Sequence, residues 1–393
     1  MDFERDWNIQ YLLMLAKAAV TQIPPPESKP GLEWNIILNL AQKHNVAGLV
    51  CYAIDLLTAK PPQEVLDKFY EIRNRYIYLD MKQNASYDRL LQLFEQNGIC
   101  NMALKGYSLQ NLYPIRDMRT MSDLDVLIKA TDQDKADRIM QEMNFTARFI
   151  KEDERAYMKD GIIGVELHFN LVSDNHPTFF QYYGDGWKHA HKKEGMAYTY
   201  EMSIEDFFIY HIVHLAKHYK VAGTGIRSIL DIYVLLEKYR DYYDWAYIQQ
   251  EFTKMNLHIF AKNMIQLSQM WFGDLECTPI LYEIESYMLS GGVYGRFDRK
   301  IDANLIQNGK VAQKNMIRLK RYFFAAFPPY KTMRGLYPCL KKYPVILPVY
   351  WIKRGIQKIF FGKKDIKRVF GTYRDLNIDN AKKMAEHLKK IGL

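Results

Sequence analysis

The stretch Met121-Ser122-Asp123-Leu124-Asp125-Val126-Leu127-Ile128 alternates acidic with apolar residues before it becomes fully apolar. Because successive side chains of a β-strand point to opposite faces, this alternation predicts a strand over residues 122–128. Asp123 and Asp125 would then share one face, and the apolar residues between them would face the core. Two carboxylates would point in the same direction beside a buried sheet.

A second stretch with the same period covers residues 165–171, which read VELHFNL. Here Glu166, His168 and Asn170 would share one strand face. If the two strands are neighbours, Glu166 completes a cluster of three carboxylates with Asp123 and Asp125. At about 4 Å and an effective dielectric of about 20, two like charges repel by roughly 4 kcal/mol. The cluster therefore predicts a bound cation, and oxygen ligands favour Mg²⁺ or Mn²⁺.

Such a cluster is typical of phosphoryl or nucleotidyl transfer, in which two metal ions hold the attacking and leaving oxygens. Upstream, the sequence Lys105-Gly106-Tyr107-Ser108 predicts a turn whose backbone amides could approach phosphates. Lys105 and Arg119 are candidates to neutralise phosphate charge. The alternative is that both acidic stretches are solvated faces of edge strands.

Around this core, hydrophobic spacing indicates helices on both sides. Short apolar segments at 99–104, 124–128, 146–150 and 162–171 alternate with a helix-like stretch at 132–143. A long helix is expected over residues 62–96. The sequence thus predicts an α+β fold with a small mixed-sheet core between helical regions, divided as 1–98 (helical), 99–200 (core), 201–309 (helical) and 310–393 (basic and aromatic).

Three histidines follow the core at helical spacing, namely His211, His214 and His218. They could line the cleft opposite the carboxylates and contact the nucleotide or the acceptor, with Arg227 on a phosphate. They could equally be structural histidines. A third interpretation is a metal phosphohydrolase site completed by Asp231 from the next helix.

Net charge is distributed unevenly along the 393 residues, which carry 54 Lys+Arg and 45 Asp+Glu for a formal charge of +9. Sixteen basic residues and one acid lie between Lys310 and Phe370, interleaved with aromatic residues. This tail could bind an anionic membrane surface, could bind nucleic acid, or could be a solvated face. The scattered cysteines and the acidic N-terminal residues predict a cytoplasmic protein, with a peripheral position at the inner face of the membrane as an option.

Taken together, the core motifs resemble the uncharacterised nucleotidyltransferase family, a bacterial branch of the DNA polymerase beta superfamily. The resemblance lies in Leu104-Lys105-Gly106, Tyr113-Pro114, Arg119, Asp123-Leu124-Asp125 and Glu166-Leu167-His168. It implies transfer of a nucleoside monophosphate from an NTP to an unknown hydroxyl acceptor. Asp123, Asp125 and Glu166 would hold Mg²⁺ or Mn²⁺, and residues 106–108 would hold the nucleotide phosphates. The alternative function is a non-catalytic nucleotide-binding protein or membrane-docked adaptor that retains this fold.

Overall fold

The computed structural model describes residues 5–150, 154–221, 223–291, 306–307, 310–311, 323–324, 326–337, 339–361 and 378–393. Its α-helices are α1(Trp7–Thr21), α2(Trp34–Lys43), α3(Ala47–Ile54), α4(Gln63–Gln96), α5(Lys105–Gln110), α6(Gln133–Glu142), α7(Pro177–Tyr183), α8(Ile204–Val221), α9(Ile226–Tyr239), α10(Trp245–Lys254), α11(His258–Phe272), α12(Pro279–Leu289), α15(Tyr330–Leu336), α16(Cys339–Lys342), α17(Leu347–Phe361) and α19(Ile378–Ile391). The strands are β1(Asn101–Ala103), β2(Asp123–Ile128), β3(Thr146–Ile150), β4(Glu154–Lys159), β5(Ile163–His168), β6(His191–Lys192), β7(Tyr200–Glu201), β8(Ile306–Gln307) and β9(Lys310–Val311).

Five strands form one mixed sheet in the order β1-β2-β5-β4-β3. β2 and β5 run parallel, whereas the β1/β2, β5/β4 and β4/β3 pairs are antiparallel. The two strands that carry the acidic residues are therefore hydrogen-bonded neighbours at the centre of the sheet. The α+β fold with a small mixed-sheet core and flanking helices is confirmed.

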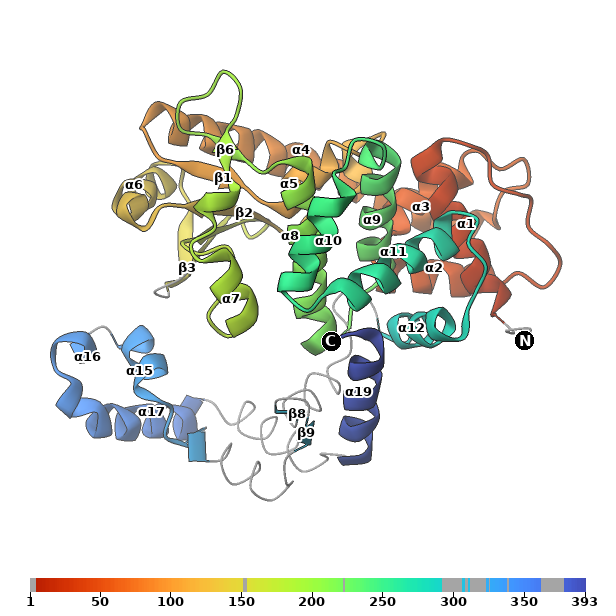
Figure 1. Cartoon of the computed structure of the whole chain (residues 1–393). Helices are drawn as coiled ribbons and strands as arrows, with labels where there is room; N and C mark the ends of the chain where they lie inside the picture. The colour runs from red at the N-terminus through yellow and green to blue at the C-terminus, as the bar shows by residue number, and fades with distance from the viewer. Residues whose placement is uncertain are drawn as a thin grey trace.

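Helix α4 connects the sheet to the N-terminal helices (Figure 1). Its second half buries Tyr87, Leu90 and Phe94 against the apolar face of β2 and against α6. Its first half buries Phe69 in a second, larger core. Because one continuous helix belongs to both cores, it fixes the sheet relative to the helical part of the molecule. The helix expected at 62–96 is confirmed.

The larger core joins helices from both ends of the sequence. α1 packs on α3 and α11, and α8 to α12 pack on one another. Arg5 forms a bidentate ion pair with the buried Glu285, and α19 contacts α11. Helices before and after the sheet thus share one hydrophobic core. The four-part division at residues 98, 200 and 309 remains a prediction.

Three local expectations differ from the structure. The strand expected at 165–171 is β5(Ile163–His168), so Asn170 lies beyond its end. Residues 105–108 begin the short helix α5 directly after β1, whereas the sequence predicted a turn. Strand β4 was not expected, because its sequence ERAYMK mixes charged and apolar residues without a clear period. β4 is a strand because it pairs antiparallel with both β3 and β5 through backbone hydrogen bonds, which its side-chain pattern does not predict.

In the C-terminal region, α15, α16 and α17 pack on one another (Figure 1). Much of the basic stretch between Lys310 and Phe370, including 312–322 and 362–370, lies outside the described residues. Within the described part of the chain, no helix combines the length and the apolar character needed to cross a membrane.

Candidate active site

The register between β2 and β5 brings the acidic residues to one place. Asp125 pairs with Glu166 and Asp123 pairs with Gly164 across the parallel ladder, so all three carboxylates lie on one face. A Cβ atom added to Gly164 would lie 3.2 Å from the Asp123 Cβ. Glycine at this position therefore leaves room for the Asp123 side chain.

Asp125 is the centre of the cluster and is only 7% exposed. His168 Nε2 lies 2.9 Å from Asp125 Oδ1 and donates to it, since an ionised carboxylate can only accept. The Lys105 ammonium group lies 3.2 Å from the other oxygen of Asp125. His168 Nε2 also lies 3.8 Å from Glu166 Oε2. Ligand atoms of Asp125, Glu166 and His168 all lie within 4.8 Å of one another, as a shared metal ion requires.

Asp123 lies at the edge of this group. Its Oδ1 accepts a hydrogen bond of 2.8 Å from the Ser122 hydroxyl. It shares the strand face with Asp125, but the group whose ligand atoms lie within 4.8 Å comprises Asp125, Glu166 and His168. His168, which was a further candidate for the cleft alongside the three helix histidines, instead lies against Asp125 and Glu166 and is not among the residues that line the cleft.

The three carboxyl groups have different proton affinities. Burial raises the pKa of Glu166 to about 7, and the negative charges of Asp123 and Asp125 add to the effect. Burial and the charge of Asp125 also raise the pKa of Asp123. Burial would raise the pKa of Asp125 as well, but the Lys105 charge and the His168 hydrogen bond outweigh it and lower that pKa. A divalent cation would relieve the repulsion that Glu166 experiences.

We therefore expect metal affinity to depend on pH through Glu166. Below its pKa of about 7 the carboxyl group is protonated and cannot act as a ligand. The dissociation constant for Mn²⁺ should rise about tenfold for each pH unit below that value, because one proton competes with the metal. Calorimetric titrations between about pH 8 and about pH 6 test this, with Glu166→Gln as the control that removes the contribution of Glu166 to the dependence. An unchanged wild-type affinity over that range would refute it.

The carboxylates form one wall of a cleft of about 450 Å³. The opposite wall comes from α8, from the α8–α9 loop and from the beginning of α9, with the lining side chains of His211, His214, Leu215, His218, Val221, Thr224, Arg227, Ser228 and Asp231. Lys105 bridges the two walls, because its ammonium group lies 3.3 Å from His214 Nε2 as well as near Asp125. The structure thus brings the histidine helix to the acids.

The cleft histidines are poor bases in this position. Burial lowers the pKa of His211, and burial followed by the charge of Lys105 lowers the pKa of His214. At neutral pH these rings are therefore uncharged and can donate or accept hydrogen bonds. Positive charge on this side of the cleft comes from Lys105 and Arg227.

Arg119 and Asp231 form a buried ion pair beneath the cleft. Nε and Nη2 of Arg119 each donate to Asp231 over 3.0 Å, and the Tyr113 hydroxyl donates to the same carboxylate over 2.7 Å. Both oxygens of Asp231 therefore already accept hydrogen bonds. The phosphohydrolase interpretation instead required Asp231 to bind a metal ion together with the histidines of α8. The third guanidinium nitrogen of Arg119, a predicted phosphate ligand, donates to the Thr120 carbonyl over 3.1 Å.

The predicted nucleotide-binding residues separate into two groups. Lys105, Gly106, Arg119 and Arg227 line the cleft. Ser108 instead lines a different cavity, and its hydroxyl lies 3.5 Å from the Ala103 carbonyl oxygen. The reason is that α5 is helical, so Ser108 lies on another face from Gly106.

Three polar residues of the cleft were not identified from the sequence, namely Ser122, Thr224 and Ser228. The Thr224 and Ser228 hydroxyls lie 2.7 Å apart where α9 begins. Gly223 has φ +87° in the loop that precedes them. The sequence Gly223-Thr224-Gly225 in front of a helix is a signal that could have indicated this loop.

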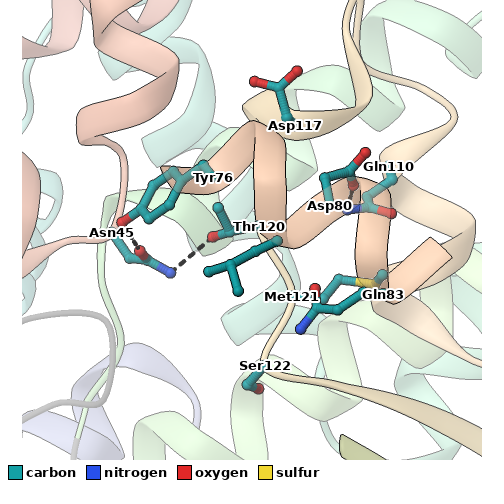
Figure 2. A pocket seen from close by; sticks show the side chains of 10 residues that line it. Asn45, Tyr76, Asp80, Gln83, Gln110, Asp117, Thr120, Met121 and Ser122 are labelled. Atoms are coloured by element: carbon teal, nitrogen blue, oxygen red, sulfur yellow. Dashed lines mark hydrogen bonds between the residues drawn. The ribbon is translucent and has the colours of Figure 1, made fainter. Parts of the chain in front are cut away.

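A smaller pocket of about 110 Å³ adjoins the cleft at Met121 and Ser122. Figure 2 shows how its polar side chains pair with one another: Asn45 bonds to both Tyr76 and Thr120, and Gln110 donates to Asp80. Gln110 also donates to the Arg119 carbonyl, and Arg227 donates to the Thr120 carbonyl. These contacts hold residues 119–122 in place just before Asp123.

A cleft with clustered acids on one wall and cationic groups on the other is typical of proteins that bind polyphosphates through metal ions. The chain belongs to the uncharacterised nucleotidyltransferase family, whose model matches residues 30–273. That range contains the sheet, α8, α9 and every residue of the cleft described above. Comparisons with curated proteins and with solved structures gave no match.

Proposed function

We propose that this protein is a metal-dependent nucleotidyltransferase that moves a nucleoside monophosphate from an NTP to a hydroxyl acceptor. The observation that carries the proposal is the pairing of Asp125 with Glu166 on adjacent parallel strands, with Asp123 on the same face. The cleft in front of these acids and the family membership support it.

The donor set fits a divalent cation, since carboxylate oxygens and a ring nitrogen converge within 4.8 Å. Asp123, Asp125 and Glu166 would hold Mg²⁺ or Mn²⁺. The metal would supply positive charge for the phosphate oxygens and for the acceptor oxygen. Glu166 would hold the metal that activates the acceptor hydroxyl.

The phosphates of the nucleotide would lie between Lys105 and the beginning of α9. Arg227 offers a guanidinium group there, and Thr224 and Ser228 offer hydroxyls. The N-terminus of a helix favours anions because its first backbone N–H groups point outward. A Cβ at Gly106 would lie 3.0 Å from the Met121 sulfur, so glycine lets the beginning of α5 pack closely on Met121 at the cleft.

A screen of the nucleoside triphosphates tests this function. The purified chain is incubated with each NTP and with Mg²⁺ or Mn²⁺, and pyrophosphate release is measured alongside nucleotide binding. We expect metal-dependent pyrophosphate release with at least one NTP once an acceptor is present. Binding without pyrophosphate release, across protein, RNA and small-molecule acceptors, would favour the non-catalytic alternative instead.

An exposed apolar stripe supports a second proposal, that the C-terminal region docks on an anionic membrane. Val345, Val349, Ile352 and Ile356 recur at helical spacing along α17 and the turn before it, and they are between 52% and 90% exposed. Lys353 is exposed beside them, over the Tyr350 ring. An apolar stripe flanked by lysine suits a surface of anionic lipid headgroups.

We expect Lys342→Gln plus Lys353→Gln to weaken binding to phosphatidylserine vesicles roughly 30-fold. Each lysine near an anionic surface contributes about 1 kcal/mol of binding free energy, and two are removed. Co-sedimentation with vesicles measures this. Lys382→Gln plus Lys383→Gln on α19 is the matched control, which removes the same charge elsewhere. Equal loss in both variants, or binding to single-stranded nucleic acid but not to vesicles, would refute the membrane proposal.

A further inference from the structure

A histidine nitrogen lies inside the carboxylate cluster. His168 Nε2 is 2.9 Å from Asp125 Oδ1 and 3.8 Å from Glu166 Oε2. Around an octahedral ion with bonds near 2.1 Å, adjacent ligand atoms lie about 3 Å apart and opposite ones about 4 Å. The ring nitrogen therefore already lies at the distances from both carboxylates that one shared ion would impose.

The position of His168 on β5 places its ring beside the Asp125 and Glu166 carboxylates. It is two residues after Glu166 on β5, so strand alternation directs both side chains to the same face. Its side chain is 21% exposed, so the ring is mostly buried beside the two carboxylates. Packing alone does not require the ring nitrogen of His168 to lie between two carboxylates.

We propose that His168 is a direct metal ligand through Nε2, whose proton leaves to solvent or moves to Nδ1 when the ion binds, and that this ligand set makes the site prefer Mn²⁺ to Mg²⁺. The inference rests on the proposed function, because it takes the cleft to be a metal site. Mg²⁺ strongly prefers oxygen ligands and retains its waters. Mn²⁺ also favours oxygen ligands but, as a first-row transition metal, accepts an imidazole nitrogen more readily than Mg²⁺ does. Replacing one oxygen ligand by nitrogen thus shifts selectivity away from Mg²⁺.

The competing role for His168 is that of a positioning residue that orients Asp125 by hydrogen bonding. His168→Gln distinguishes the two roles, because the glutamine amide can still donate to Asp125 but offers no imidazole nitrogen. His191→Gln is the matched control, since His191 is an exposed histidine that lies outside both the cleft and the group within 4.8 Å. Thermal unfolding of both variants verifies that they fold.

Pulsed electron paramagnetic resonance of the full chain loaded with Mn²⁺ alone provides the direct test. We expect a nitrogen coupling from a bound imidazole in the wild type and in His191→Gln, and its loss in His168→Gln. Calorimetry should show Mn²⁺ binding at least about tenfold weaker in His168→Gln, with Mg²⁺ affinity changed by less than about threefold.

Two results would overturn the inference. Mn²⁺ bound without nitrogen coupling, or equal weakening of both metals in His168→Gln, would make His168 a positioning residue while leaving the metal site intact. Failure of the wild type to bind Mn²⁺ at all would overturn the proposed function together with this inference.

Discussion

Asp123→Asn plus Asp125→Asn should abolish pyrophosphate release, with a fall of at least about 1,000-fold, equivalent to about 4 kcal/mol of transition-state stabilisation. The amides keep the size of the side chains but remove two negative charges from the proposed metal site. The Lys105 charge that now faces Asp125 would then lose its partner. Steady-state pyrophosphate release at saturating NTP and metal measures the effect.

The matched control for this variant is Asp88→Asn, which also changes a carboxylate to an amide. Asp88 lies on α4 and accepts from Tyr107 outside the cleft. The pyrophosphate release of the Asp88→Asn variant should stay close to that of the wild type. Full pyrophosphate release in Asp123→Asn plus Asp125→Asn would exclude these acids from the reaction.

The second large effect is on stability, and it concerns the Arg119–Asp231 pair. Asp231 is 2% exposed and Arg119 is 8% exposed, so Asp231→Ala would leave a buried guanidinium group without its counter-charge. Breaking a buried pair in this way costs about 3–5 kcal/mol of unfolding free energy. Tyr113 would lose its hydrogen-bond acceptor in the same change. Chemical denaturation measures the free energy of unfolding.

Two further variants make this prediction specific. Glu64→Ala removes an exposed carboxylate that pairs with Lys68 on α4, and it should not change stability measurably. Arg119→Met plus Asp231→Leu removes both charges and should recover much of the lost stability. A loss in Asp231→Ala no larger than that in Glu64→Ala would show that the pair does not hold the sheet to α9.

How far the sequence predicts this structure depends on whether a feature is local. Strands β2 and β5 were predicted, with slightly different ends, because side chains alternate with period two over residues 122–128 and 165–171. Their parallel pairing, which the sequence left conditional, is present and places Asp125 beside Glu166. Helix α4 was predicted because its amphipathic pattern extends over 34 residues.

Features that depend on distant residues were not predicted. The partner of Arg119 lies 112 positions away, so no spacing rule relates it to Asp231. The position of Ser108 depends on whether α5 is a helix or a turn, and six residues are too few for periodicity to decide. The approach of His168 to both acids depends on side-chain conformation, which strand alternation restricts to a face but does not fix.

The geometry of the cleft is compatible with two kinds of phosphate transfer. The roles of Asp123, Asp125 and Glu166 in holding metal, and of Lys105, Gly106 and Arg227 in holding phosphate, rest on their meeting in one cleft. The same geometry would serve phosphoryl transfer, because the two reactions use the same acids and differ in which phosphorus atom is attacked. The fate of each phosphate therefore separates them.

The most direct test of nucleotidyl transfer is the fate of a labelled phosphate. The chain is incubated with metal, acceptor and an NTP labelled either at the α-phosphate or at the γ-phosphate. Nucleotidyl transfer predicts that the α-label appears on the acceptor and the γ-label in pyrophosphate, and that Asp123→Asn plus Asp125→Asn prevents both. Transfer of the γ-label to the acceptor, or retention of both labels in intact NTP under every condition, would contradict the proposed function.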